Sequence, residues 1–279
     1  MKIGIIGSSG FLGKNLKNFL VKRKKKVTLF SSFNSNKKNW ITKVSNEIKR
    51  KKPEVLINCS AYQNLSYSHK NIKKLLKSNL YSNIFFLDQA TKNKNFKAYI
   101  SFGTKWELGN SKKEPLNFYA ATKQANESFF KFYSNKRISI ISLKIFDTYG
   151  KNDLRKKFLN DLLRCYKRNR VLNITHGKQY LDYVNIDDIC TLIDLILNNL
   201  KQKKNIGFKT YTVSSKKPIK LLSLVNNLKK ILDKKLMVNV GNIKYRSNES
   251  LKPIKDFSNY PGWKIQNNLM KDLKKIFDG

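Results

Sequence analysis

Arginine, acidic residues and histidine are scarce in this sequence of 279 residues. Only eight of the 58 Lys and Arg residues are Arg, the acidic residues number 18, and the net charge is +40. A charge of this size suggests a nucleic acid or an anionic membrane as partner. Arg, however, is the usual residue for recognising phosphates and bases, and the lysines are spread along the whole chain. We therefore expect no dedicated nucleic-acid partner, but a basic surface that attracts a phosphorylated substrate and cofactor.

Cysteine is also rare, and no two cysteines form a C-x-x-C pair. The three are Cys59, Cys165 and Cys190. This pattern argues against a disulfide framework and a zinc site, and it fits a reducing compartment. The two histidines, His69 and His176, are isolated, so we expect no metal site. No apolar run approaches the ~20 residues that span a bilayer, and glycines interrupt the short apolar start, which excludes a signal peptide. We expect a cytoplasmic protein without membrane attachment.

Strand and helix patterns alternate through the first 150 residues. Short apolar runs predict buried strands, and apolar residues at helical spacing predict the helices between them. The predicted strands are 2–6, 26–30, 54–58, 96–101 and 138–146, and the predicted helices are 11–23, 41–51, 72–91 and 119–133. This alternation predicts an α/β fold of the Rossmann type, a doubly wound parallel sheet with helices on both faces.

After Gly150 the alternation becomes looser. The predicted helices are 154–169, 185–200, 219–232 and 269–277, and the predicted strands are 210–213 and 236–240. We expect a dinucleotide-binding domain at 1–150 and a smaller, mainly substrate-binding lobe at 151–279. The chain is expected to return to the first domain around 176–215.

Gly7, Gly10 and Gly13 form a G-x-x-G-x-x-G motif between the first predicted strand and the first predicted helix. Gly7 would allow the tight turn, Gly10 the approach of a pyrophosphate to the backbone, and Gly13 the close packing of helix on sheet. The N-terminus of the helix would add free N–H groups and a partial positive charge. The alternative is a glycine-rich turn without a ligand, but the position between strand and helix favours a dinucleotide site.

The residue after the second predicted strand bears on the cofactor's phosphate. A site that prefers NAD usually has Asp or Glu here, which accepts a hydrogen bond from the ribose. This sequence has Ser31, followed by Lys37 and Lys38. An uncharged residue would not repel a 2′-phosphate, so NADP is the favoured prediction, with NAD as the alternative.

Tyr119 and Lys123 form a Y-x-x-x-K motif at the start of a predicted helix, where this spacing places both side chains on one face. A phenol has a pKa near ~10, and a neighbouring ammonium favours its ionised form. Tyr119 is therefore a candidate general acid or base for a sugar-like carbonyl or alcohol. Thr104 follows a predicted strand, at the edge where the crevice is expected, and its hydroxyl could bind the reacting oxygen. The alternatives are an exposed helical Tyr and a Thr that caps a turn.

In this order, the three motifs resemble the extended short-chain dehydrogenase/reductase family of NAD(P)-dependent nucleotide-sugar epimerases, dehydratases and reductases. Other segments are similar to that family at 58–61, 78–79, 143–150, 180–188 and 211–213. The resemblance implies that Thr104, Tyr119 and Lys123 are catalytic. The expected cofactor-binding residues are Gly7, Gly10, Phe11, Leu12, Gly13, Ser31, Ser60, Ala61, Asn79, Tyr119, Lys123 and Phe146. The expected substrate-binding residues are Tyr62, Thr104, Trp106, Asp147, Arg155 and Lys178. Arg155 and Lys178 are also consistent with solvated surface charges.

One departure from the family narrows the expected reaction. Dehydratases of the family have an Asp-Glu pair after the catalytic Thr, whereas Lys105 and Trp106 follow Thr104 here. Segments 103–106, 117–125 and 146–155 most resemble the 4-ketoreductases of the CDP-abequose synthase type. The resemblance thus implies NAD(P)H-dependent reduction of a 4-keto nucleotide sugar, a CDP- or dTDP-linked deoxyhexose, in the synthesis of surface-polysaccharide sugars. Two rivals remain open: a 4-epimerase with tightly bound NAD, and a non-catalytic protein that binds a nucleotide sugar or a nucleic acid.

The resemblance also implies a homodimer. Relatives usually dimerise through the helix that carries Y-x-x-x-K and its neighbouring helix. Phe129, Phe130 and Phe132, near the end of this predicted helix, could supply the apolar contact or could pack in the core.

Overall fold

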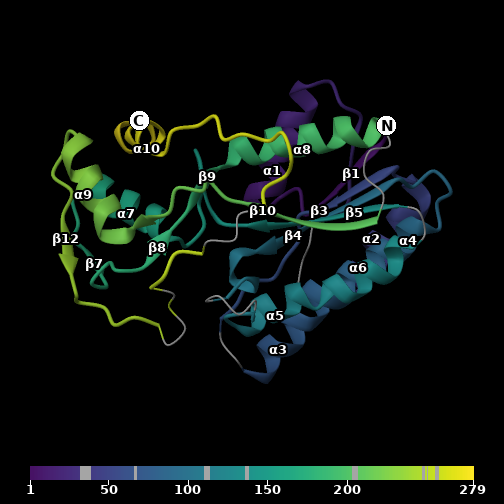
Figure 1. Ribbon diagram of the computed structural model, residues 1–279, viewed down its shortest axis with the longest axis horizontal. Coiled ribbons are helices and arrows are strands. Elements are labelled where there is room, and N and C mark those ends of the chain that lie inside the picture. The colour runs from purple at the N-terminus through teal and green to yellow at the C-terminus, as the bar shows by residue number, and fades with distance from the viewer. Residues whose placement is uncertain are drawn as a thin grey trace.

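The computed structural model has a six-stranded sheet at its centre, in which all neighbouring strands run parallel, in the order β10-β5-β4-β3-β1-β2 (Figure 1). The strands are β1 (Ile3–Ile6), β2 (Val27–Leu29), β3 (Val55–Asn58), β4 (Ala98–Thr104), β5 (Ser139–Ile145) and β10 (Gly207–Val213). The structure describes residues 1–31, 39–65, 68–109, 114–135, 138–202, 207–246, 249, 251–254 and 258–279. Lys37 and Lys38 lie outside the described residues.

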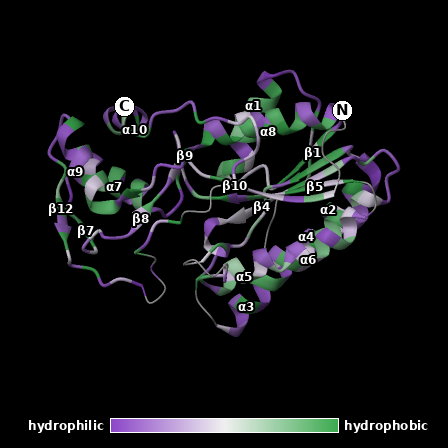
Figure 2. Cartoon of the chain, viewed as in Figure 1, coloured by the Kyte–Doolittle hydropathy of each residue, from purple (hydrophilic) through white to green (hydrophobic). Residues whose placement is uncertain are grey.

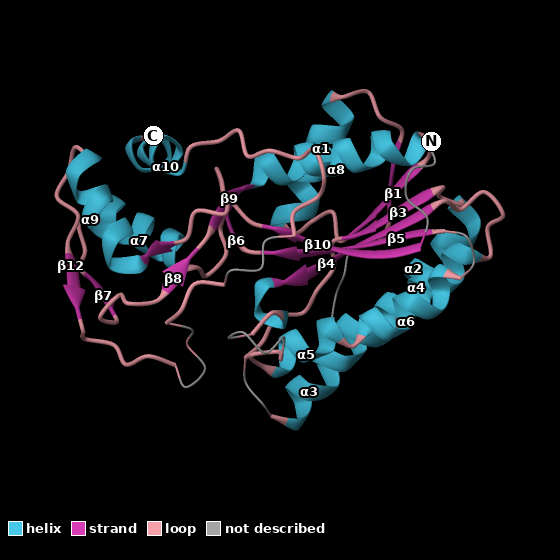
Figure 3. Cartoon of the chain, in the orientation of Figure 1, coloured by secondary structure: helices cyan, strands magenta, loops and turns pink. Residues whose placement is uncertain are grey.

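Helices cover both faces of this sheet, which is why its central strands are apolar on both sides. One face carries α1 (Phe11–Lys22) and α8 (Ile186–Lys201), and the other carries α2 (Trp40–Lys51), α4 (Ser82–Thr91) and α6 (Asn126–Ser134) (Figures 1 and 3). All four residues of β1 and of β3 are buried, and Figure 2 shows the hydrophobic strands between the helices. The predicted doubly wound α/β fold is confirmed.

Two predicted helices are interrupted. The helix expected at 72–91 consists of α3 (His69–Leu75), a π-helical turn (Leu76–Tyr81) and α4. The helix expected at 119–133 is divided at Ala125 into α5 (Phe118–Gln124) and α6. The π-helical turn buries Asn79 where it faces α5, and such turns often occur at functional sites.

A second group of elements, here called the C-terminal lobe, lies beside the sheet, on the left of Figure 1. It comprises α7 (Phe158–Lys167), α9 (Leu221–Ile231), α10 (Leu269–Asp278), β7 (Leu172–Ile174), β8 (Tyr180–Leu181), β11 (Ile219–Lys220) and β12 (Val238–Val240). Its own apolar core includes Leu162, Leu224 and Leu228. Between lobe and sheet, β6 (Asp147–Tyr149) pairs with β9 (Tyr183–Asn185). The predicted division into 1–150 and 151–279, with a return around 176–215, stays a prediction.

The helix expected at 154–169 begins only at Phe158. The residues before it form a loop, in which the guanidinium of Arg155 binds the carboxylate of Asp153 and the hydroxyl of Thr148. These side-chain bonds hold the chain outside helical geometry. None of the described helices is long and apolar enough to cross a membrane.

The strand order creates a switch point between β1 and β3. From β1 the chain moves outward to β2, and it then returns to place β3 on the other side of β1. In open parallel sheets, ligands bind beyond the carboxyl ends of the strands at such a point. The turn after β1 and the segment after β3 are therefore where a ligand site is expected.

Candidate functional site

The glycine turn after β1 packs against the end of β3. Gly7 has a φ of +78°, and a Cβ added to it would lie 2.7 Å from the backbone nitrogen of Ser60. A Cβ on Gly13 would lie 2.9 Å from the carbonyl carbon of Gly7, so α1 can approach the turn this closely only with glycine. Gly10 differs, because a Cβ there would meet only the carbonyl oxygen of Gly7, at 3.6 Å. The space in front of Gly10 is open.

The N-terminus of α1 points an uncompensated partial positive charge at this open space. Gly10 is the N-cap residue and provides no capping side chain, and the first turn contains no acidic residue. The first N–H groups of a helix have no intrahelical acceptors, so those of Phe11, Leu12 and Gly13 are suited to bind an anion. The guanidinium of Arg155 lies 4.2 Å from the ring centroid of Phe11 and adds a cation at the same place. These residues fit the pyrophosphate of a dinucleotide.

Asn58 organises the segment after β3. Its Oδ1 accepts hydrogen bonds from the N–H of Ser60 at 3.0 Å and from the Ser60 hydroxyl at 2.6 Å. Its Nδ2 donates to Asn83 Oδ1 at 2.9 Å and to the hydroxyl of Tyr99 at 3.0 Å. This buried network fixes Ser60 and the following Ala61 beside the glycine turn. The sequence interpretation missed Asn83, a polar residue on the buried side of an apolar helix.

Asn79, on the π-helical turn, holds the next part of the chain against α5. Its Oδ1 accepts from the N–H of Tyr62, and its Nδ2 donates to the carbonyl of Tyr62, both at 2.9 Å. The same Nδ2 lies 3.3 Å from Thr122 Oγ1. The Tyr62 hydroxyl donates to Asn71 at 3.1 Å. The amide of Asn79 therefore connects the segment after β3 to α5 through hydrogen bonds to protein groups.

Tyr119 and Lys123 are both buried in α5. The N-cap of this helix is Asn117, whose side chain accepts from the N–H of Ala120 at 2.9 Å. The Lys123 side chain is within electrostatic range of Cys59, the residue that follows β3. A Cβ on Gly7 would lie 2.9 Å from the carbonyl carbon of the same Cys59. The Y-x-x-x-K helix and the glycine turn therefore both lie near the end of β3.

Burial controls the protonation of this pair. It lowers the pKa of Lys123 to about 8, although nearby Glu107 favours the ammonium. Burial also raises the pKa of Tyr119 above its usual value, and Glu107 raises it further. At neutral pH the pair thus consists of a neutral phenol, which can give up a proton, and an ammonium.

Thr104 and Trp106, at the end of β4, lie next to Tyr119. The Thr104 hydroxyl accepts from the N–H of Trp106 at 3.4 Å, so the residue does cap the turn after β4. Its hydroxyl proton is still available for donation. The ring of Trp106 stands edge-on to that of Tyr119, with centroids 6.2 Å apart and an interplanar angle of 85°. The structure thus brings Thr104, Trp106, Tyr119 and Lys123 together.

Charged residues of β6 and of the loop that follows it lie close to Lys105 and Trp106. Asp147 forms an ion pair with Lys105, and Arg155 binds Asp153 through two nitrogens, at 2.8 and 2.6 Å. The ammonium of Lys157 lies 5.9 Å from the centroid of the Trp106 ring, and burial followed by repulsion from Arg155 lowers its pKa. The sequence interpretation missed Lys157 because nothing distinguishes it from the many other lysines.

The remaining predicted residues lie at two other places. Phe146 is buried directly after β5, where its N–H donates to the carbonyl of Val213 at 3.2 Å. Lys178 is exposed on the C-terminal lobe, and its N–H donates to the hydroxyl of Tyr245, in the same lobe, at 3.0 Å. Its observed contact is thus away from the glycine turn.

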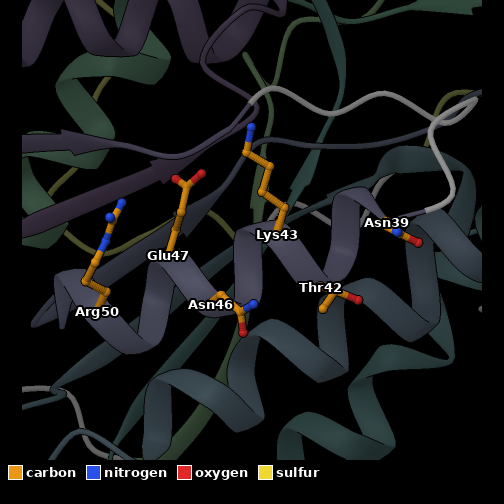
Figure 4. A pocket seen from close by; sticks show the side chains of 6 residues that line it. All are labelled: Asn39, Thr42, Lys43, Asn46, Glu47 and Arg50. Carbon is orange, nitrogen blue, oxygen red and sulfur yellow. The ribbon is translucent and has the colours of Figure 1, made fainter.

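A carboxylate lies at the end of β2, although the sequence has Ser31 there. The N–H of Ser31 donates to Glu47 Oε2 at 3.1 Å, and the Ser31 hydroxyl donates to Oε1. Burial opposes ionisation of Glu47, but hydrogen bonds from Lys51 and Ser31 outweigh it and hold its pKa below the usual value. Glu47 is one of six residues that line a pocket of about 750 Å³ along α2, together with Asn39, Thr42, Lys43, Asn46 and Arg50 (Figure 4).

Comparisons with known proteins agree with this geometry. Residues 3–210 match the model of the NAD dependent epimerase/dehydratase family. CDP-abequose synthase of Yersinia pseudotuberculosis is 24% identical over 274 residues, which cover 91% of this chain and 92% of that protein. Protein CapI of Staphylococcus aureus is 24% identical over 287 residues, which cover 86% of each chain.

Solved structures show the same fold. The UDP-glucuronic acid 4-epimerase of Bacillus cereus, in complex with UDP-glucuronic acid and NAD, has a TM-score of 0.83 and 20% identity, covering 100% of this chain and 98% of that one. RMD of Pseudomonas aeruginosa, complexed with NADPH, has a TM-score of 0.76 and 18% identity, covering 100% and 99%. The family model covers the sheet up to residue 210 in β10, the glycine turn and the Y-x-x-x-K helix, and the chain therefore belongs to the NAD dependent epimerase/dehydratase family.

Proposed function

We propose that this protein uses a nicotinamide dinucleotide to reduce the 4-keto group of a CDP- or dTDP-linked deoxyhexose, in the synthesis of surface-polysaccharide sugars. The observation that carries the proposal is the buried Tyr119–Lys123 pair, which lies near the end of β3, as the glycine turn does. The similarity to CDP-abequose synthase over nearly the full length of both chains supports this substrate class.

Each residue of the pair has a defined task in this reaction. A reduced nicotinamide dinucleotide, held by its pyrophosphate at the glycine turn, would supply the hydride. The Tyr119 hydroxyl donates a proton to the oxygen that was the ketone, so that hydride and proton together yield the alcohol. The Lys123 ammonium stabilises the phenolate left behind, and the Thr104 hydroxyl donates a hydrogen bond to the carbonyl oxygen.

Dehydration is disfavoured because a free acid and base are lacking after Thr104. Lys105 is paired with Asp147. Glu107 is the first acidic residue after Thr104, but its carboxylate is buried and accepts from the N–H of Thr104 at 2.6 Å. Neither side chain is placed to remove a proton from a hexose and release water.

The decisive assay mixes the purified protein with NADH or NADPH and a 4-keto nucleotide sugar. We expect the absorbance of the reduced nicotinamide to fall in proportion to the alcohol formed. A 4-epimerase would instead retain its dinucleotide through purification and interconvert two sugars without a net absorbance change. A binding protein would do neither.

For the cofactor, we propose NADH in place of the NADP predicted from Ser31. The support is Glu47, whose carboxylate binds Ser31 and supplies the negative charge that the sequence lacks at the end of β2. Such a charge accepts a hydrogen bond from a ribose hydroxyl and repels a 2′-phosphate.

Replacing Glu47 by Gln should therefore raise the affinity for NADPH on the order of tenfold, because it removes one like charge at close range. Calorimetric titration without substrate measures this directly. Asp233→Asn removes an exposed carboxylate of the C-terminal lobe and should leave both affinities unchanged. Wild-type protein that binds NADPH as tightly as NADH would contradict the proposal.

We propose a homodimer formed through α4 and α6. Phe129 and Phe132 of α6 are 42% and 64% exposed and Tyr81, just before α4, is 55% exposed, whereas Phe130 is buried in the core.

Phe132→Asp should convert the dimer to a folded monomer, because it places a charge in an apolar interface. Sedimentation velocity checks this, with Val171→Asp on the C-terminal lobe as the control. A monomeric wild type would refute the dimer. The cytoplasmic location stays a prediction.

A further inference from the structure

Glu107 is a buried acid three residues after Thr104, next to the candidate catalytic residues, and the proposed reaction does not use it. Its residue is 1% exposed. Its Oε1 accepts from the backbone N–H of Thr104 at 2.6 Å, which closes a reciprocal capping box at the turn after β4. A Cβ on Gly103 would lie 3.2 Å from its carboxyl carbon, so the glycine leaves room for the carboxylate. The carboxyl group of Glu107 thus fixes the backbone at Thr104 through this hydrogen bond.

A buried lysine connects Glu107 to α6. The ammonium of Lys144, on β5, lies 3.7 Å from Glu107 Oε2 and 2.9 Å from Glu127 Oε1. The Lys144 side chain is 8% exposed and that of Glu127 is 24% exposed. Lys144 pairs with Gly103 in the sheet register, which places it directly beside the turn. The charges of Glu107, Lys144 and Glu127 therefore form a row that runs from the turn after β4 toward the surface of α6.

Glu107 also acts on both residues of the catalytic pair. Burial raises the pKa of Glu107 itself to about 7, and the nearby Glu127 carboxylate adds to this rise. Lys144, the Thr104 N–H and Lys123 lower the pKa but do not offset the effect of burial. Its negative charge favours the ammonium of Lys123 and the neutral phenol of Tyr119. The groups around it are thus Lys144 on β5, Glu127 on α6, and Tyr119 and Lys123 on α5.

We propose that Glu107 is a positioning residue, which holds Thr104 through the backbone and, once ionised, keeps Lys123 in its ammonium form. The inference rests on the proposed function, because it concerns the same acid–base pair. It adds that a carboxylate outside the motifs sets the alkaline limit of the reaction. With the anion in place, Lys123 retains its proton in spite of its burial.

Glu107→Gln separates the two tasks, since the amide oxygen can still accept from Thr104 while the charge is lost. At about pH 6 Glu107 is mostly protonated, so wild type and variant should have similar kcat. Above pH 7 the variant should lose activity several-fold more, with the alkaline limb of its profile moved to lower pH by about one unit. Glu54→Gln is the matched control, since Glu54 also accepts a backbone N–H, from Lys2 at 2.6 Å, but lies directly before β3, at the opposite end of the parallel strands from Thr104. It should leave the profile unchanged.

Thermal unfolding as a function of pH gives a second measurement that needs no turnover. Folded Glu107 holds its proton up to a pKa of about 7, whereas a free glutamate has a pKa of 4.5. Its contribution to stability is therefore present at low pH and is lost as the pH rises from 4.5 to 7. The Tm of the wild type should fall relative to that of Glu107→Gln across this range and run parallel to it above.

The outcomes separate the inference from the proposed function. An equal loss of activity at every pH, or two superimposable pH profiles, would overturn the role of the Glu107 charge. Absence of turnover in the wild type would overturn the proposed function. The unfolding experiment would still test Glu107 in that case. If the difference in Tm between the wild type and Glu107→Gln does not change with pH, the raised pKa of Glu107 is refuted.

Discussion

Tyr119→Phe is expected to reduce kcat by about a thousandfold and to leave dinucleotide binding intact, because it removes only the proton donor. Phe preserves the ring, and with it the edge-on packing against Trp106. The phenol is buried and its pKa is raised, so it is protonated at neutral pH and can act as the proton donor. Stopped-flow or steady-state assays with a 4-keto nucleotide sugar measure the rate, and calorimetry measures cofactor binding.

Tyr133→Phe is the matched control. Tyr133 is also buried, but it lies on α6, and its hydroxyl donates to Asp88 at 3.1 Å. We expect this variant to keep full activity. A Tyr119→Phe protein that retains most of the wild-type rate would remove the assigned acid from the reaction.

Gly13→Ala is expected to weaken dinucleotide binding at least about tenfold and to cost about 1–3 kcal/mol of stability, since the methyl group forces α1 away from the turn. Its Cβ would lie 2.9 Å from both the Gly7 carbonyl carbon and the Ser8 Cα. These contacts are backbone atoms, which cannot move aside as a flexible side chain would. Denaturant titration and calorimetry measure the two losses.

Gly10→Ala tests the same turn without this clash. A Cβ there meets only the Gly7 oxygen, at 3.6 Å, and Gly10 has a φ of −73°, which any residue tolerates. We expect wild-type stability together with a loss of binding, because the methyl group would occupy the open space before α1. Unchanged binding in this variant would mean that the pyrophosphate lies elsewhere.

The sheet was predictable from sequence because its strands are continuous apolar runs between turn residues, as at 2–6 and 54–58. The short strands β6, β7, β8 and β9 were not predicted. Each has two or three residues and depends on partners far away in the sequence, such as Asp147 with Tyr183. The π-helical turn within 72–91 also leaves no local signal, because the apolar spacing continues through it.

Some residues of the candidate site could likewise be predicted from the sequence, and others could not. The glycine turn, Tyr119 and Lys123 were predictable because each motif is local and its spacing has a direct geometric meaning. Glu47 and Glu107 were not, since their importance comes from partners such as Ser31 and Lys144 that only the fold brings near. In the sequence, Glu47 is indistinguishable from any acidic residue of a helix that lies four residues before a lysine, here Lys51. Glu107 is indistinguishable from an acidic residue in a loop.

The most direct test of the account is a crystal structure of the protein with bound dinucleotide and nucleotide sugar. We predict the pyrophosphate at the N-terminus of α1 and the nicotinamide beside Lys123. The Tyr119 hydroxyl should lie within about 2.6–3.2 Å of the oxygen on C4 of the sugar. A dinucleotide bound away from the glycine turn, or a sugar whose C4 oxygen is out of reach of Tyr119, would contradict the account.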